Sequence, residues 1–210
     1  MNDYRCTRYC LHLCDINLKK NIFLKNFNQI HPNAKNHYSY IKERKGKLKG
    51  EFLSIYNNKC AYCGNSIKNL SIDLFEIDHF IPKERFTNSN DANNIFNLVA
   101  SCHVCNRLKS NYDITESNKN LFDVETSLPK LFKRDENYYI KINNEYKSNA
   151  DVVSFYEHLH LGYQTKRIDF VLMELNGMID DHKYYKIRDQ LIALYKEIVD
   201  KRNLISSFSQ

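Results

Sequence analysis

Two Cys-x-x-Cys pairs are the part of this sequence whose residue types and spacing most directly indicate chemistry. Cys60 and Cys63 form the first pair, and Cys102 and Cys105 form the second. The four thiolates are enough to close a tetrahedral zinc site, although two unrelated pairs are the alternative. Thiolates are soft ligands that suit zinc, so we predict a structural zinc ion that contributes directly to folding. His103 lies inside the second pair and could replace a thiolate, but four cysteines make that unnecessary.

The segment between and just after the pairs carries polar residues suited to phosphodiester hydrolysis. This reaction requires an activated water and a cation that neutralises charge on the phosphate and the leaving oxygen. His79 is suited to act as the general base, because an imidazole has its pKa near working pH. Asp78 offers an oxygen ligand for a hard cation, and Asn106 is placed to offer a second. Asn97 is placed to brace the loop that carries His79.

Basic residues near these motifs predict contacts with a polyanion. The run from Lys42 to Lys49 holds five basic residues against one acidic, and the net charge of the chain is +6. Such a run is typical of a solvated helix face or of a phosphate-binding face, and its position before Cys60 favours the second. We therefore expect nucleic-acid contacts from five side chains, namely Lys45, Lys47, Lys49, Arg107 and Lys109.

Three motifs follow one another within residues 60–110: Cys-x-Tyr-Cys-Gly, Glu-Ile-Asp-His-Phe-Ile-Pro, and Asn-Leu-Val-Ala-Ser-Cys-x-x-Cys-Asn-x-x-Lys-Ser. In this order and spacing they resemble HNH (ββα-metal) endonucleases of the McrA-like, zinc-stabilised type. The resemblance implies that His79 is the general base, Asp78 a ligand of the catalytic metal, and Asn97 the orienting asparagine. Asn106 occupies the third signature position, where the family often has histidine. An asparagine there favours Mg²⁺ or Mn²⁺ as the catalytic ion.

The C-terminal part of the chain resembles a narrower group within this family. Its segments Leu131-Phe132-Lys133-Arg134, Leu161-Gly162-Tyr163 and Arg167-Ile168-Asp169 are similar to HNH proteins of bacterial defence operons, the PtuB-like partner of the Septu ATPase among them. This resemblance implies a role in anti-phage defence beside an ABC-type ATPase.

Hydrophobic periodicity predicts an α+β fold, with mainly helical regions at both ends of a central ββα unit that the zinc site holds together. The expected strands cover residues 72–77 and 98–101, and the expected hairpin covers 137–147. The expected helices cover 38–56 (interrupted by Gly46 and Gly50), 106–112, 150–179 (broken near Gly162) and 181–202. This pattern divides the chain into an N-terminal helical region (1–56), a zinc-bound nuclease core (57–118) and a C-terminal hairpin and helical region (119–210).

The cysteine count and the absence of a long apolar segment predict that the protein lies in the cytoplasm. No stretch approaches the ~18 apolar residues of a transmembrane helix, and the N-terminus has no signal-peptide pattern. Seven cysteines, four of them at metal-ligand spacing, indicate a reducing cytoplasm. Cys6, Cys10 and Cys14 recur every fourth residue, which is typical of packing or incidental thiols, with a second metal or iron–sulfur site as the alternative.

These observations leave three functional hypotheses. The first is an endonuclease that cuts DNA, and the second is the same chemistry on RNA such as tRNA, since the attack on phosphate does not depend on the sugar. The third is a zinc-stabilised module that binds nucleic acid or a partner protein without cutting it. Glu76 is interpreted as a strand residue that supports the site or is solvated, and it is not counted as catalytic.

Overall fold

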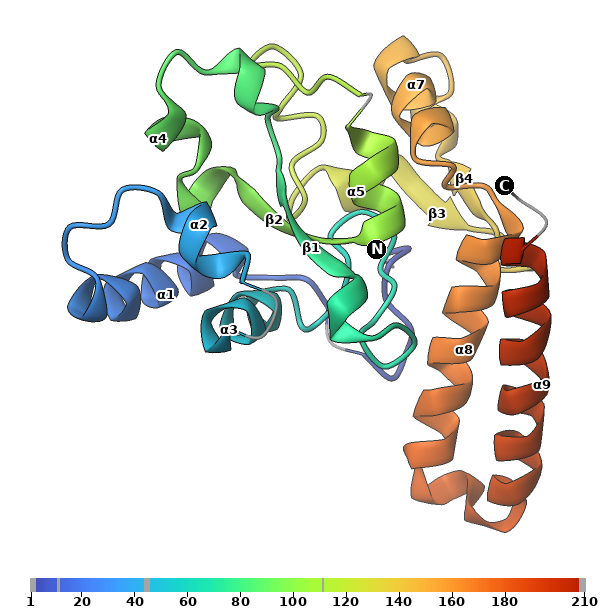
Figure 1. The fold of residues 1–210 in the computed structure, drawn as a ribbon. Coiled ribbons are helices and arrows are strands. Elements are labelled where there is room, and N and C mark those ends of the chain that lie inside the picture. Colours follow the sequence, from blue (N-terminus) through green and yellow to red (C-terminus); the bar gives the residue numbers. More distant parts are fainter. Residues whose placement is uncertain (1–2, 11, 44–45, 111, 208–210) are drawn as a thin grey trace.

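The structure is a computed structural model that describes residues 3–10, 12–43, 46–110 and 112–207 of the 210-residue chain. Two small antiparallel sheets lie among helices, so the predicted α+β class is confirmed (Figure 1). The α-helices are α1 (Ile16–Ile30), α2 (His37–Ile41), α3 (Lys47–Ile55), α4 (Ser89–Ala92), α5 (His103–Lys109), α6 (Leu128–Leu131), α7 (Ala150–His158), α8 (Gln164–Asp180) and α9 (Arg188–Ser207). The strands are β1 (Phe75–His79), β2 (Leu98–Cys102), β3 (Phe132–Arg134) and β4 (Ile140–Ile142). Within the described residues, no helix combines the length and the apolarity that a membrane crossing requires.

The centre of the molecule is a ββα unit formed by β1, β2 and α5. The two strands pair along their whole length, from Phe75 opposite Cys102 to His79 opposite Leu98. Helix α5 follows β2 without a connecting loop and begins at His103, three residues earlier than predicted. Strand β1 begins at Phe75 rather than Ile72, because residues 72–74 form a short 3₁₀ helix. The predicted ββα order is therefore confirmed with shifted boundaries, and the segment between the strands, predicted as a loop, holds α4 and two short 3₁₀ helices.

The N-terminal helices lie on one side of this unit (Figure 1). The helix predicted over residues 38–56 is two helices, α2 and α3, and Gly46 in extended conformation (φ −74°, ψ 137°) precedes α3. Gly50 lies inside α3, where its missing side chain does not interrupt the helix. The ring of Phe23 packs against Phe27, also on α1, and against Phe52 of α3, and all three side chains are buried in the core.

The C-terminal region contains one wrong prediction and one confirmed break. The hairpin predicted over residues 137–147 does not form, because β4 pairs with β3 from residues 132–134, and residues 144–146 form a 3₁₀ helix. A break near Gly162 separates α7 from α8, as predicted. Helices α8 and α9 form a long antiparallel pair (Figure 1). Asp169 of α8 accepts hydrogen bonds from Arg202 of α9 (2.5 Å) and from Asn65 (2.7 Å), which ties this pair to the loop after Cys63.

Lys20 is a buried cation on the core-facing side of α1. Its side chain is 3% exposed, and its Nζ donates to the carbonyl of Phe96 (3.4 Å). Burial lowers the pKa of Lys20 to about 7, despite the neighbouring carboxylates of Asp123 and Glu125. In the unfolded chain the same group keeps its proton up to a pKa of ~10.4. The unfolded state therefore binds more protons between about pH 7 and pH 10, and the free energy of unfolding rises with pH over that window.

Replacing Lys20 by methionine is expected to raise the free energy of unfolding by a few kcal/mol at pH 7, because it removes this burial cost. The gain should shrink as the pH approaches 10, where the wild-type amine is already neutral in the folded state. Urea unfolding of the wild type and of the variant at pH 7 and at pH 9.5 measures the gain in the free energy of unfolding at each pH. Lys19→Met is the matched control, since the Lys19 ammonium is solvent-facing and donates to Cys14. An equal gain at both pH values would contradict the prediction.

Candidate active site

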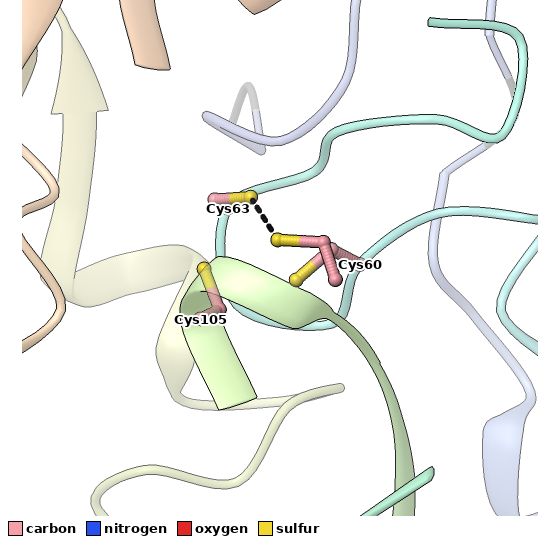
Figure 2. A group of neighbouring side chains, drawn as sticks. Cys60, Cys63 and Cys105 are labelled. Carbon is pink, nitrogen blue, oxygen red and sulfur yellow. Dashed lines mark hydrogen bonds between the residues drawn. The ribbon is translucent and has the colours of Figure 1, made fainter. Parts of the chain in front are cut away.

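The four predicted zinc ligands come together at the junction of the first Cys-x-x-Cys loop, the end of β2 and the start of α5. The sulfur atoms of Cys60, Cys63, Cys102 and Cys105 all lie within 4.8 Å of one another, and all four residues are buried. Figure 2 shows Cys60, Cys63 and Cys105 directed toward a common centre. Four soft donors at this spacing fit a zinc ion.

The first loop depends on a glycine for its shape. Gly64 adopts φ +78°, and its amide donates to the carbonyl of Cys60 (2.9 Å), which closes the turn around the cluster. A Cβ atom at this position would lie 2.5 Å from the carbonyl oxygen of Arg5. Both the left-handed backbone and the close approach of residue 5 therefore require glycine.

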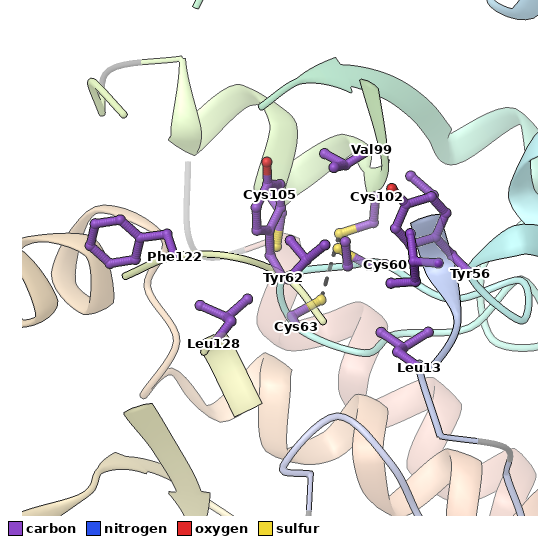
Figure 3. Packing of buried hydrophobic residues seen from close by; sticks show 14 of the residues in the cluster. Leu13, Tyr56, Cys60, Tyr62, Cys63, Val99, Cys102, Cys105, Phe122 and Leu128 are labelled. Carbon is purple, nitrogen blue, oxygen red and sulfur yellow. Dashed lines mark hydrogen bonds between the residues drawn. The ribbon is translucent and has the colours of Figure 1, made fainter. Parts of the chain in front are cut away.

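The cluster lies among mostly apolar core side chains, and a buried cation contacts one of its sulfur atoms. Figure 3 shows the cysteines packed among core side chains that include Leu13, Tyr56, Tyr62, Val99, Phe122 and Leu128. Lys166 of α8 donates to the sulfur of Cys105 (3.2 Å). Although burial opposes a charge here, the neighbouring thiolates raise the pKa of Lys166. The ammonium offsets part of the negative charge that four thiolates carry, and it ties α8 to the ββα unit.

Helix α5 packs on the face of β1 that carries Glu76 and Asp78. Glu76 Oε1 faces His103 Nδ1 at 2.8 Å, and Glu76 Oε2 accepts from Asn106 Nδ2 at 2.5 Å. Burial opposes ionisation of Glu76, but the hydrogen bonds from His103 and Asn106 lower its pKa. A carboxylate, an imidazole and an amide thus meet in a half-exposed cluster at the start of α5.

Asp78 lies two residues further along the same face and is almost completely buried. Its Oδ2 accepts from the hydroxyl of Tyr62 (2.6 Å) and lies 3.2 Å from Lys109 Nζ. Lys109 also donates to the carbonyl of His79 (2.8 Å). Burial raises the pKa of Asp78, while the positive charge of Lys109 acts against that rise. The structure therefore places Lys109 inside the site, with its ammonium directed at Asp78 and not toward solvent.

His79 ends β1, with its ring in a different environment from Asp78. Nε2 lies 2.9 Å from Oδ1 of Asn93, and the ring centroid lies 4.4 Å from that of Tyr38. An amide oxygen only accepts hydrogen bonds, so Nε2 carries the ring proton and Nδ1 carries the lone pair. Burial lowers the pKa of His79 to about 4, although the contact with Asn93 acts in the opposite direction.

Asn97 lies at the base of the long loop and does not contact the imidazole. Its Oδ1 accepts from the amide of Ile81 (2.9 Å), and its Nδ2 donates to the carbonyls of Ile81 (3.0 Å) and Ala92 (2.9 Å). The side chain is buried and joins both ends of the loop that follows His79. This arrangement corresponds to a bracing residue, not to one that touches the reacting atoms.

The remaining predicted phosphate-binding side chains have different environments. Arg107 is exposed on α5, and Lys47 is exposed at the start of α3, 3.5 Å from Glu51. Lys49 is buried and donates to the carbonyl of Ile72 (3.2 Å), so its ammonium does not face solvent. Lys45 lies outside the described residues.

A groove of about 460 Å³ runs past the Glu76 cluster. Glu76, His103 and Asn106 line one part of it, and Tyr38 and Lys42 line another. The ring of Tyr38 lines the groove and also packs on the imidazole of His79. Sequence reasoning did not assign Tyr38 or Asn93 to the site. The period-two spacing of Glu76 and Asp78 was a signal for a shared face, whereas nothing local in the sequence connects Asn93 with His79.

Comparison with known protein families gives one match. The model described as HNH endonuclease matches residues 60–112, which span β1, β2, α5 and all four clustered cysteines. The curated proteins and the solved structures gave no match. This family indicates hydrolysis of phosphodiester bonds in nucleic acid. Residues 60–112 form an HNH endonuclease domain that holds a buried four-cysteine cluster.

Proposed function

We propose that this chain is a divalent-metal-dependent endonuclease that hydrolyses phosphodiester bonds in DNA. One observation carries the proposal: oxygen donors on β1 and α5 meet at Glu76 and Asn106 in a groove lined by Tyr38, whose ring also packs on the imidazole of His79, and the strand and helix lie inside the segment that matches the HNH endonuclease model. The groove along Glu76 and Asn106 supplies space for a phosphate backbone next to these groups.

In the proposed reaction, His79 is the general base. The lone pair on its Nδ1 accepts the proton from the attacking water, while Asn93 holds Nε2 and fixes the tautomer. Tyr38 packs on the ring and limits its rotation. Asn97 acts as a positioning residue, because it joins the two ends of the loop after His79.

Asp78 and Asn106 are the residues that would hold the catalytic Mg²⁺ or Mn²⁺ ion, with Glu76 as the neighbouring carboxylate. Carboxylate and amide oxygens are hard donors, which fits either ion. When bound, such an ion neutralises charge on the phosphate and on the leaving oxygen. Lys109 orients the carboxylate of Asp78 through their 3.2 Å contact.

A cleavage assay tests the proposal. The zinc-loaded chain is incubated in parallel with plasmid DNA and with total RNA, each with Mg²⁺, with Mn²⁺ and without a divalent ion. The proposal expects metal-dependent nicking or linearisation of the plasmid. Cleavage of RNA but not of DNA would identify RNA as the substrate. Tight binding without turnover under every condition would indicate a binding module.

Two exposed ammonium groups beside Tyr38 are the side chains we expect to contact phosphate. Lys83 Nζ lies 4.6 Å from the centroid of the Tyr38 ring, and Lys42 Nζ lies 5.4 Å from it. Both therefore lie near the imidazole of His79 without belonging to the cluster on α5.

Lys83→Ala is expected to weaken DNA binding equally across sequences and to reduce the slope of log K against log salt by about 1, because one phosphate contact is lost. Fluorescence anisotropy at several salt concentrations measures the slope. Lys196→Ala on the exposed side of α9 is the matched control and should leave it unchanged. An unchanged slope in Lys83→Ala would show that this side chain does not contact phosphate.

The biological setting is a finer part of the proposal. The similarity of residues 131–134, 161–163 and 167–169 to PtuB-like proteins supports a role in anti-phage defence beside an ABC-type ATPase. The McrA-like type is proposed from the motif order in residues 60–110, the cytoplasmic location from the cysteine usage, and the division at residues 56 and 118 from the pattern of expected elements. A nuclease that its partner controls would have little activity when purified alone, so a negative assay is repeated with the ATPase present.

A further inference from the structure

A second group of cysteines lies beside Lys59, the residue before the first zinc-binding loop, and takes no part in the zinc cluster. Cys6 and Cys10 come close through two consecutive turns, in which the Cys6 amide donates to Asp3 (2.9 Å) and the Cys10 amide donates to Thr7 (3.3 Å). Both sulfur atoms contact the same ammonium: Lys59 Nζ lies 3.1 Å from Cys6 Sγ and 3.5 Å from Cys10 Sγ.

The surroundings of Cys10 favour its thiolate. The amide of Thr7 donates to the sulfur (2.9 Å), and Lys59 is 2% exposed, so little water screens its charge. The hydrogen bond from Cys6 and the charge of Lys59 lower the pKa of Cys10, although burial acts against this. The thiolate is the reactive form of cysteine, and a neighbouring cation favours the thiolate over the thiol.

A small molecule can reach this pair. Cys10, Lys59 and Thr7 line a cavity of about 300 Å³, and Cys6 lines a second cavity of about 380 Å³. We propose that Cys10 and Cys6 are an oxidisable pair, in which a hydroperoxide reacts with Cys10 and Cys6 then closes a disulfide bond.

The chemistry balances with the hydroperoxide as the only oxidant. The Cys10 thiolate attacks one peroxide oxygen, the O–O bond breaks, and the leaving alkoxide or hydroxide takes a proton, which gives the sulfenic acid. The sulfur of Cys6 then attacks Cys10, the S–S bond forms, and the hydroxyl leaves as water with the thiol proton of Cys6. In total, two electrons pass from the two thiols to the peroxide.

A metal site is the competing interpretation of the same residues. Ligand atoms of Asp3, Cys6 and His12 lie within 4.8 Å of one another. However, both oxygens of Asp3 accept hydrogen bonds from the Arg5 guanidinium (2.9 and 2.8 Å), and the Lys59 ammonium lies next to the sulfur. Two cations already surround these donors, so the arrangement favours a thiolate over a metal ion.

The test uses the full-length chain loaded with zinc. Zinc protects the four clustered thiolates, which leaves Cys6, Cys10 and Cys14 to react with a thiol reagent. Treatment with an equimolar amount of hydrogen peroxide should remove two of these three thiols without release of zinc. Tryptic peptides 6–8 and 9–19 should then be joined, with Cys14 still alkylated in the fragment spectrum.

Matched variants assign the residues. Cys14→Ser should still lose two thiols, because Cys14 is exposed and hydrogen bonding with Asp15 raises its pKa. Cys10→Ser and Cys6→Ser should form no linked peptides, while their zinc content stays at one ion per chain. A linkage through Cys14, or peroxide treatment that leaves all three thiols, would overturn the proposal. Two zinc ions per chain with Cys6 and Cys10 protected would overturn it in favour of the metal site.

Discussion

Cys105→Ala is expected to abolish stoichiometric zinc binding and to remove the cooperative unfolding of the ββα unit. Cys105 belongs to α5 and is fully buried, and its sulfur shares one centre with three others. Metal binding at structural zinc sites amounts to roughly 10–16 kcal/mol in isolated zinc-finger peptides. A whole domain has a net stability of only about 5–15 kcal/mol. The free energy lost with the ion is therefore larger than the packing of the short strands β1 and β2 can supply.

Zinc content by mass spectrometry, near-ultraviolet circular dichroism and thermal unfolding together measure this effect. Cys14→Ser is the control, since Cys14 is an exposed cysteine outside the cluster, and it should keep full zinc content and the wild-type unfolding temperature. A zinc-free Cys105→Ala protein with native circular dichroism and unchanged unfolding would show that the cluster is not needed for the fold.

His79→Ala is expected to lower the rate of phosphodiester cleavage on the order of 10²- to 10⁴-fold, the usual contribution of a positioned general base. The loss should appear in kcat, because the proposed mechanism gives proton transfer to His79 and phosphate binding to the exposed lysines beside Tyr38. DNA affinity measured without a divalent ion, a condition in which the proposal expects no turnover, should remain within about twofold of wild type.

Two comparisons separate catalysis from folding. His182→Ala replaces an exposed histidine between α8 and α9 and should cleave at the wild-type rate. Asn93→Ala keeps the imidazole but removes the partner of its Nε2, so it should lose part of the rate, with zinc content and unfolding temperature unchanged. Wild-type cleavage by His79→Ala would remove this residue from the mechanism.

Local patterns in the sequence were sufficient for the ββα unit. Its strands and helix are short, α5 follows β2 directly, and the two cysteine pairs mark where the elements meet, so their order and type were predictable without distant contacts. The hairpin at residues 137–147 was predicted wrongly because its apolar alternation fits more than one partner. Strand β4 pairs instead with residues 132–134, since Phe132 packs into the aromatic cluster around Phe155 and brings β3 alongside.

The sequence by itself determined which four cysteines form one cluster, and it singled out the Asp-His pair as the candidate site, because both patterns are properties of neighbouring residues. The tertiary structure alone decided which charges face one another. Lys109 is directed into the site because α5 lies along β1, and Lys49 is buried because its side chain reaches Ile72. The contact between His79 and Asn93 joins two ends of a loop whose path depends on Asn97. Such contacts depend on how elements dock on one another, which periodicity along a single segment does not encode.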